Sequence, residues 1–367
     1  MSFKLDYFFV IMIICSRIYV NSLIKSLNKN CIKQKRPLIN HLKRRSLSTS
    51  FDYRLYCTDK NENDATVIDG KATAARIRSE LALQITQLKD NFNAIPGLAV
   101  VLVGERRDSS TYVRMKKRAC DEVGIASYDY NYSVDVTEEE LISTINELNQ
   151  DEKIHGILVQ LPLPLHIIES NVLNSILPEK DVDGLHPINI HNLASTGTRI
   201  PGKTTFSFDS VDYHVSCTPQ GCVELLDRYD IEIAGKNAVV VGRSNIVGVP
   251  LALLLMKRDA TVTIAHSKSI DLPSIVSRAD IVIAACGRAN MVTSDMIKDD
   301  AVVIDVGINS VEDSTDKRGY KLIGDVDYDN VKSKASYITP VPGGVGPMTI
   351  AMLLRNTFQA CRRSVMG

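Results

Sequence analysis

The sequence predicts an α/β protein of two domains with a cleft between them. Three observations indicate this fold class: short apolar runs alternate with amphipathic helical patterns, the alternation occurs in two series, and a polar stretch at 195–216 separates the series. Strands that alternate with helices are typical of βαβ units and parallel sheets. A chain of 367 residues is long enough for two domains of ordinary size.

The first series opens with a helix whose predicted N-cap is Asp69. Its apolar residues recur at helical spacing and fall on one face, which is formed by Ile77, Leu81, Ile85 and Leu88. The apolar run 98–103 lies between Pro-Gly and Gly and predicts a strand that is buried on both faces.

Two more helices and a strand complete this series. Residues 108–122 predict a helix that ends near Gly124, and Thr137 with Glu140 forms a capping box ahead of another helix. The run 156–161 predicts the next buried strand, which ends at Pro162 because proline cannot donate a backbone hydrogen bond.

The second series predicts four apolar strands, which are 239–241, 261–264, 281–285 and 302–306. A helix is expected through 251–255, and the amphipathic last helix, 348–361, is expected to pack back onto the first domain. We therefore expect residues 65–210 to form the first domain, completed by 345–363. Residues 211–344 are expected to form a Rossmann-like parallel sheet.

The N-terminus differs from the rest of the chain in charge. The whole chain has 43 Lys and Arg against 43 Asp and Glu, which does not indicate a nucleic-acid partner. Residues 1–51 hold ten Lys or Arg and one carboxylate, Asp6, and end in an Arg- and Ser-rich run. This composition predicts a mitochondrial import segment over 1–60, which we exclude from the fold.

Two alternatives to mitochondrial import are kept. The apolar run 7–15 also resembles the core of a secretory signal, although it is shorter than the roughly 20 apolar residues of a membrane span, so no stable membrane insertion is expected. An untargeted, cytoplasmic chain is the other alternative. The eight cysteines form no C-x-x-C pair and no zinc spacing, so we expect free thiols and no metal site.

Gly242 and Gly248 bound a turn between a predicted strand and a helix, where backbone can approach a pyrophosphate at a helix N-terminus. The spacing is G-x-x-x-x-x-G, which a strand–turn–helix without a ligand also explains. The next strand ends without the carboxylate that usually binds the ribose of NAD. Arg243 and Ser267 are suited to a 2′-phosphate instead, which favours NADP over NAD, although Ser267 is also compatible with a helix cap.

Polar side chains of the first domain have two interpretations each. Tyr112 and Lys116 share a helix face, which is either a ligand site or a solvated surface. Gln160 lies in an apolar strand, so its amide is either paired in the core or directed at a ligand. The segment 181–186 is turn-like and its carboxylates are also compatible with caps. The Pro- and Gly-rich loop 340–349 either holds backbone against a flat ligand or is a rigid connection.

Taken together, these segments resemble the methylenetetrahydrofolate dehydrogenase/cyclohydrolase family from about Thr66 to the C-terminus. The matching motifs occur in order: Tyr112 with Lys116, then 159–164, 181–184, 242–248 and 340–349. The resemblance implies oxidation of 5,10-methylenetetrahydrofolate with NADP, followed by hydrolysis of the methenyl product to 10-formyltetrahydrofolate. It also implies a homodimer.

The resemblance implies roles for individual residues. Lys116 is expected to be the acid and base of the hydrolysis and to bond to Gln160, with Tyr112 stacking on the folate and Asp183 bonding the pterin. The expected folate-binding residues are Tyr112, Val113, Lys116, Val159, Gln160, Leu161, Asp183, Pro342, Gly343, Gly344, Val345 and Gly346. Those expected to bind the cofactor are Gly242, Arg243, Ser244, Ser267 and Ile308.

The chain departs from the family pattern in two places. The stretch 195–216 is longer than is usual in the family, and Ser216 stands where the family commonly has proline. Two alternative functions are kept: a dehydrogenase of another small substrate, which leaves Lys116 and Gln160 unexplained, and a mitochondrial form that prefers NAD with magnesium and phosphate.

Overall fold

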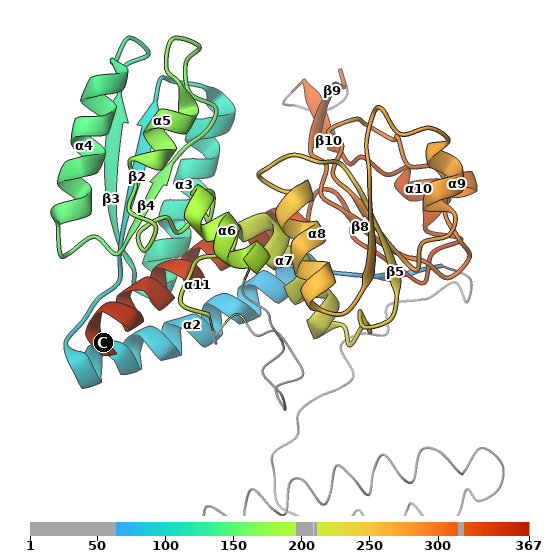
Figure 1. Ribbon diagram of the computed structural model, residues 1–367, viewed down its shortest axis with the longest axis horizontal. Coiled ribbons are helices and arrows are strands. Elements are labelled where there is room, and N and C mark those ends of the chain that lie inside the picture. Colours follow the sequence, from blue (N-terminus) through green and yellow to red (C-terminus); the bar gives the residue numbers. More distant parts are fainter. Residues whose placement is uncertain (1–63, 196–207, 209–210, 315–318, 367) are drawn as a thin grey trace, which may run out of the picture. The chain divides into compact units, whose positions relative to one another are not determined.

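The computed structural model describes residues 64–195, 208, 211–314 and 319–366. The expected import segment and most of the polar stretch at 195–216 lie outside the described residues. The described residues belong to one compact unit, which contains two parallel sheets and a hairpin (Figure 1). The expected α/β architecture is therefore confirmed.

The smaller sheet has three parallel strands in the order β3-β2-β4, namely β3 (Ala126–Tyr132), β2 (Gly97–Val103) and β4 (Gly156–Val159). β2 and β4 were expected from their apolar runs, and both are fully buried. β3 is not among the strands that were expected from the sequence. It is an edge strand with polar residues at alternate positions, so it has no continuous apolar run.

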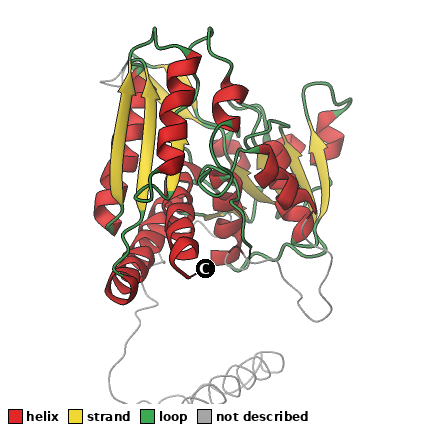
Figure 2. Cartoon of the chain, turned by 60° about the vertical axis from the view of Figure 1, so that its left-hand side comes forward, coloured by secondary structure: helices red, strands yellow, loops and turns green. Residues whose placement is uncertain are grey.

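Helices cover both faces of this sheet (Figure 2). Alternate residues of β2 separate the two cores: Leu98 and Val100 pack against α2 (Gly70–Phe92) and α3 (Arg107–Val123), whereas Ala99 and Val101 pack against α4 (Glu138–Gln150). The expected caps are present, because the Asp69 carboxylate accepts the N–H of Ala72 at 2.8 Å and α4 begins with a capping box. α5 (Glu169–Asn174) and α6 (Pro187–Ser195) follow β4.

The larger sheet has six parallel strands in the order β1-β11-β8-β7-β5-β6. They are β1 (Thr66–Val67), β11 (Tyr337–Ile338), β8 (Val302–Asp305), β7 (Ile281–Ala284), β5 (Asn237–Val241) and β6 (Thr261–Ala265). The chain runs from β5 to β6 on one side and then to β7 on the other, which places the switch point between β5 and β7. The four strands of the second series are confirmed.

One boundary differs from the expectation. Residues 66–67, which we assigned to the first domain, form β1 and pair with β11 of the larger sheet. A two-residue strand is too short to show a periodic sequence pattern, so β1 can be recognised only from its pairing with β11 in the folded chain. A hairpin of β9 (Asn309–Glu312) and β10 (Tyr320–Ile323), with α9 (Leu272–Val276), η2 (Ser294–Met296) and α10 (Tyr328–Val331), completes this half.

Three helices join the two halves. α11 (Val345–Met366) lies along α2 and α7 (Cys217–Arg228) and also contacts β2 and β4 (Figure 1). The last helix thus packs back onto the first half as expected, because one of its faces is apolar and is buried there. α7 also packs against α8 (Gly248–Lys257) of the larger sheet.

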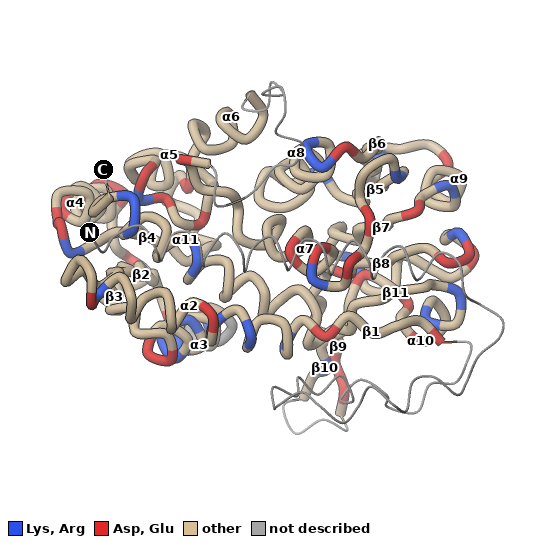
Figure 3. The backbone as a smooth tube through the Cα atoms, turned by 90° about the horizontal axis from the view of Figure 1, so that it is seen from below, with Lys and Arg blue, Asp and Glu red and all other residues tan. Residues whose placement is uncertain are grey.

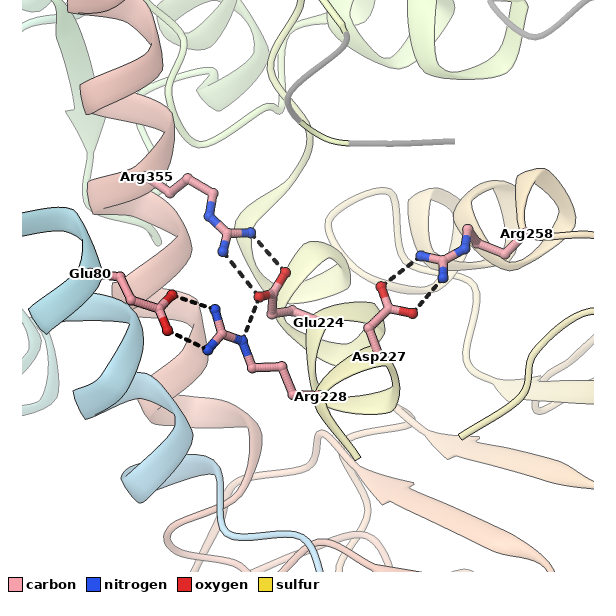
Figure 4. A network of polar contacts seen from close by, with 6 residues as sticks. All are labelled: Glu80, Glu224, Asp227, Arg228, Arg258 and Arg355. Atoms are coloured by element: carbon pink, nitrogen blue, oxygen red, sulfur yellow. Dashed lines mark hydrogen bonds and ion pairs between the residues drawn. The ribbon is translucent and has the colours of Figure 1, made fainter. Parts of the chain in front are cut away.

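Ion pairs tie these helices to α7 (Figure 4). Glu224 accepts two hydrogen bonds from Arg355 of α11, at 2.8 and 3.0 Å, and one from Arg228, at 2.8 Å. Arg228 in turn holds Glu80 of α2 with two bonds of 2.6 and 2.8 Å, and Arg258 pairs with Asp227. Residues of both charges are also intermixed along α2, α3 and α7 (Figure 3). Bidentate guanidinium–carboxylate pairs fix orientation as well as distance, so the network holds α2, α11 and α7 in one arrangement.

Candidate active site

Lys116 lies on the buried face of α3. Its Nζ donates a hydrogen bond of 2.9 Å to Oε1 of Gln160, which follows β4, and Gln160 Nε2 donates to the carbonyl of Leu161 at 2.9 Å. Only 8% of Lys116 is exposed, whereas the next residue, Lys117, is exposed. The solvated-surface interpretation is therefore wrong for Lys116, because the helix turns this one side chain toward the sheet.

Burial lowers the pKa of the Lys116 amine, since the protonated form loses hydration. The negative charge of Asp183 acts in the opposite direction but does not cancel this effect. Burial therefore raises the fraction of Lys116 that is neutral, while the side-chain amide of Gln160 accepts the hydrogen bond from its Nζ.

Asp183 belongs to a turn that is fixed from two sides. Asp181 is buried, and its carboxylate accepts the N–H of His186 at 2.7 Å and the amide of Asn189 at 2.8 Å. The Ser216 hydroxyl donates to the carbonyl of Gly184 at 2.8 Å. The Asp181 carboxylate thus accepts hydrogen bonds that fix the turn, as the capping interpretation expected. The negative charge of Asp183 instead favours the protonated form of Lys116.

A cavity of about 1440 Å³ adjoins this site. It brings together residues of the two halves that the sequence analysis singled out, namely Tyr112, Val113, Ile308, Pro342, Gly343, Gly344, Val345 and Gly346. Burial raises the pKa of Tyr112, whose side chain is half-buried. Residues 340–347 therefore line a cavity; 340–344 belong to the connection between β11 and α11, and 345–347 begin α11, three residues before the expected start of the last helix.

The remaining expected folate-binding residues are not among those that line this cavity. Lys116 and Gln160 bond to each other, Val159 is buried in β4, and Leu161 is half-buried. The cavity extends instead along the other flank of α3, past Met115 and Lys117.

Gly242 occupies the turn between β5 and α8 and has a φ of +139°, which favours glycine. A Cβ on Gly242 would lie 2.1 Å from the carbonyl oxygen of Ala285, and one on Gly248 would lie 2.4 Å from the Gly242 oxygen. Ser244 Oγ accepts the N–H groups of Val247 and Gly248 at 3.2 and 3.4 Å, at the start of α8. The backbone thus forms a close turn at a helix N-terminus, and this geometry fits a dinucleotide pyrophosphate.

Arg243 and Ser267 follow adjacent strands and are both exposed. The N–H of Gly242 donates to the Ala265 carbonyl at 2.8 Å, which brings the ends of β5 and β6 together. Ser267 does not cap a helix, because the cap of α9 is Asp271. β6 ends at Ala265, and no carboxylate occurs in the following His266, Ser267 and Lys268. The exposed Arg243 and Ser267 could therefore both reach a phosphate beside the turn.

Two buried carboxylates near the carboxyl ends of these strands, Asp305 and Asp325, were not expected from the sequence. The sequence signal for them is a nearby glycine, in Asp305-Val306-Gly307 and in Gly324-Asp325. Within the part of the chain that the structure describes, no group of three or more His, Cys, Asp or Glu residues is arranged to hold a metal ion.

The fold and the site define a class of protein: an α/β enzyme in which a Rossmann-like sheet stands beside a half that buries a lysine suited to acid–base chemistry. Two family models match the chain, the tetrahydrofolate dehydrogenase/cyclohydrolase catalytic domain over 68–183 and the NAD(P)-binding domain of the same family over 216–365.

Relatives match over most of the chain. The chloroplastic bifunctional protein FolD 4 of Arabidopsis thaliana is 54% identical over 304 residues, 83% of this chain and 81% of that one. The mitochondrial FolD 1 of the same plant is 53% identical, covering 83% of each. A crystal structure of the Trypanosoma brucei methylenetetrahydrofolate dehydrogenase-cyclohydrolase with NADP and an inhibitor has a TM-score of 0.76 and 41% identity, covering 83% of this chain and 99% of that one. The chain belongs to the tetrahydrofolate dehydrogenase/cyclohydrolase family.

Proposed function

We propose that this chain is a bifunctional enzyme that oxidises 5,10-methylenetetrahydrofolate to 5,10-methenyltetrahydrofolate with NADP and hydrolyses the product to 10-formyltetrahydrofolate. Membership of the family and the names of its relatives support both activities. The observation that carries the proposal is the buried Lys116–Gln160 pair, in a chain that also has the Gly242 turn. A dehydrogenase of another small substrate would have no use for that pair.

Lys116 is the acid and base of the hydrolysis in this proposal. The water molecule that attacks the cationic methenyl carbon loses both of its protons as it becomes the formyl oxygen. A ring nitrogen gains one proton as its bond to that carbon breaks, and the other is released to solvent. A neutral amine can take a proton from the water and deliver one to the ring nitrogen, and burial favours the neutral form. The hydrogen bond to Gln160 fixes the position of Nζ.

The hydride step depends on orientation more than on proton transfer. Bound NADP would supply the hydride acceptor. We assign Tyr112 to stacking on the folate rings and Asp183 to hydrogen bonding with the pterin. Residues 342–346 are assigned to the folate end of the cavity, and this role is supported by the fact that they line the same cavity as Tyr112.

We assign the cofactor to Gly242, Arg243, Ser244, Ser267 and Ile308. The close turn at Gly242 supports a pyrophosphate there, and exposed Arg243 and Ser267 support a 2′-phosphate. The solved relative with NADP supports the same cofactor. An NAD-preferring mitochondrial form is the second candidate, which the Arg-rich N-terminus favours.

Domain boundaries, location and assembly are further parts of the proposal. We assign folate binding to 65–210 with 345–363, and the dinucleotide to 211–344. We propose mitochondrial import through residues 1–60; relatives include both a chloroplastic and a mitochondrial form. Among the described helices, none combines the length and apolarity needed to cross a membrane.

We also propose a homodimer, as the resemblance to the family implies; the exposed Val311 on the two-stranded ribbon β9–β10 supports a contact there. Sedimentation of the purified chain measures its oligomeric state. A monomer at micromolar concentration would contradict the dimer.

One experiment tests the activities and the cofactor. The purified full chain is assayed with methylenetetrahydrofolate and NADP, with NAD, and with NAD plus magnesium and phosphate. In separate reactions the hydrolysis is followed from methenyltetrahydrofolate without any dinucleotide. We expect both activities and a preference for NADP. Hydrolysis without any oxidation would refute the proposed dehydrogenase activity. A preference for NAD would favour the second candidate, the NAD-preferring mitochondrial form.

A further inference from the structure

The side chain of Asp325 is fully buried, and its carboxylate accepts hydrogen bonds from two separate segments near the carboxyl ends of the strands of the larger sheet. Oδ2 accepts the N–H groups of Cys286 and Gly287 at 2.7 and 2.8 Å. Oδ1 accepts the N–H of Arg288 at 2.8 Å and the side-chain amide of Asn309 at 2.9 Å. All four donors are neutral amides, so the carboxylate orders backbone and does not neutralise a cation.

Asp305, at the end of β8, fixes Asp325 in turn. Its carboxylate accepts the N–H groups of Gly307 at 2.9 Å, Asp325 at 2.9 Å and Val326 at 3.0 Å. A Cβ on Gly307 would lie 2.2 Å from Asp325 Oδ1, and one on Gly324 would lie 1.8 Å from Asp305 Oδ2. The two carboxylates and the backbone around them therefore form one close-packed unit, which we call the Asp305–Asp325 brace.

The brace lies where a dinucleotide is expected to bind. It fixes the loop 286–288 after β7 and the loop 306–308 after β8, at the carboxyl ends of parallel strands next to the switch point. Ala285, just before the first loop, is the residue whose carbonyl lies against Gly242. Val306, Gly307 and Ile308 of the second loop line the cavity.

Three successive N–H groups, those of Cys286, Gly287 and Arg288, converge on one carboxylate. Such a cluster of backbone donors is a typical anion-binding concavity. Here the chain's own Asp325 occupies it, so these donors are not available to a phosphate of the cofactor. Without Asp325, three amides would lose their acceptor and the loop would rearrange to satisfy them.

We propose that Asp325, held by Asp305, is a positioning residue for the dinucleotide-dependent step. It fixes the two loops that flank the cofactor and takes no part in the hydrolysis at Lys116. The inference rests on the proposed function, because it assigns the brace to one of two activities.

The test separates the two activities in the full-length protein. Asp325→Asn keeps the size of the side chain but replaces one acceptor oxygen with a donor that faces N–H groups. We expect the KM and the Kd for NADP to rise by about tenfold or more, since bonds to a charged acceptor are lost. Hydrolysis of methenyltetrahydrofolate without a dinucleotide should stay within about twofold of the wild type. Asp327→Asn, two residues further on, is the matched control. The Asp327 carboxylate accepts a hydrogen bond from the exposed Asn330 side chain at 2.7 Å, so this variant should change neither activity.

A second variant keeps the proposal testable if Asp325→Asn does not fold. Asn309→Ala removes one of the four donors and should raise the KM for NADP severalfold while hydrolysis is unchanged. Unchanged NADP binding in folded Asp325→Asn would refute the positioning role of Asp325. A parallel loss of both activities in either folded variant would also refute it. The wild type is measured alongside, and the absence of an activity there would refute the proposed function instead.

Discussion

Replacing Lys116 with methionine is the most direct test of the site. Methionine keeps most of the length and apolar packing of the side chain and removes the amine that bonds Gln160. Hydride transfer needs no proton from this residue, whereas methenyl hydrolysis does. We therefore expect Lys116→Met to lose the hydrolysis and to keep part of the oxidation, so that methenyltetrahydrofolate accumulates.

The expected size of the loss follows from the role. General acid–base catalysis contributes typically about 10²- to 10⁴-fold, which corresponds to roughly 3–5 kcal/mol of transition-state stabilisation. The fold should tolerate the change. Burial lowers the pKa of Lys116, so its protonated form opposes folding at neutral pH. Removing the amine removes the free-energy cost of burying a charge. This gain offsets the loss of the hydrogen bond to Gln160 Oε1.

The assay follows the formation of reduced dinucleotide and the absorbance of methenyltetrahydrofolate in the same reaction, with melting temperatures as a check on folding. Arg118→Met is the matched control, because Arg118 is exposed two residues further along α3. Near-normal hydrolysis by Lys116→Met would refute the acid–base role. A parallel loss of both activities would make Lys116 a binding residue only.

Three further predictions address the cofactor and the fold. Arg243→Ala should raise the KM for NADP, but not for NAD, by roughly 10- to 150-fold, the effect of a charge-assisted phosphate contact; equal effects in steady-state assays would exclude a 2′-phosphate role. Gly242→Ala should abolish dinucleotide binding measured by calorimetry, because the new Cβ would meet the Ala285 carbonyl; normal affinity would contradict the close turn. Glu224→Ala should lower the unfolding free energy by about 3 kcal/mol in urea, since two arginines lose a buried partner. Burial raises the pKa of Glu224, but Arg355 and Arg228 lower it more. This stabilisation is therefore present above pH 4.5 and should fade as the pH falls through the lowered pKa; a difference between wild type and variant that stays constant until both unfold in acid would contradict this.

Local patterns in the sequence predicted much of the fold. Asp69 and the Thr137–Glu140 capping box mark the starts of two helices, and both bonds are present, because a cap depends only on residues three positions apart. Apolar runs predicted β2, β5, β7 and β8, because strands buried on both faces need apolar residues throughout. The alternating edge strand β3 and the two-residue β1 were missed, since each is defined by its partner strand.

The sequence by itself also determined the family and the residue types of the candidate site, because the motifs occur as short contiguous runs. Only the tertiary structure decided how those residues act. The resemblance implied that Lys116 bonds to Gln160, 44 positions away, and the structure confirms this bond; helix spacing alone left open whether Lys116 lies in a site or on a solvated surface. The Asp305–Asp325 brace likewise joins segments 20 to 39 positions apart. Burial and hydrogen bonding between distant segments leave no periodic trace in a single sequence, so the environment of each side chain had to come from the folded chain.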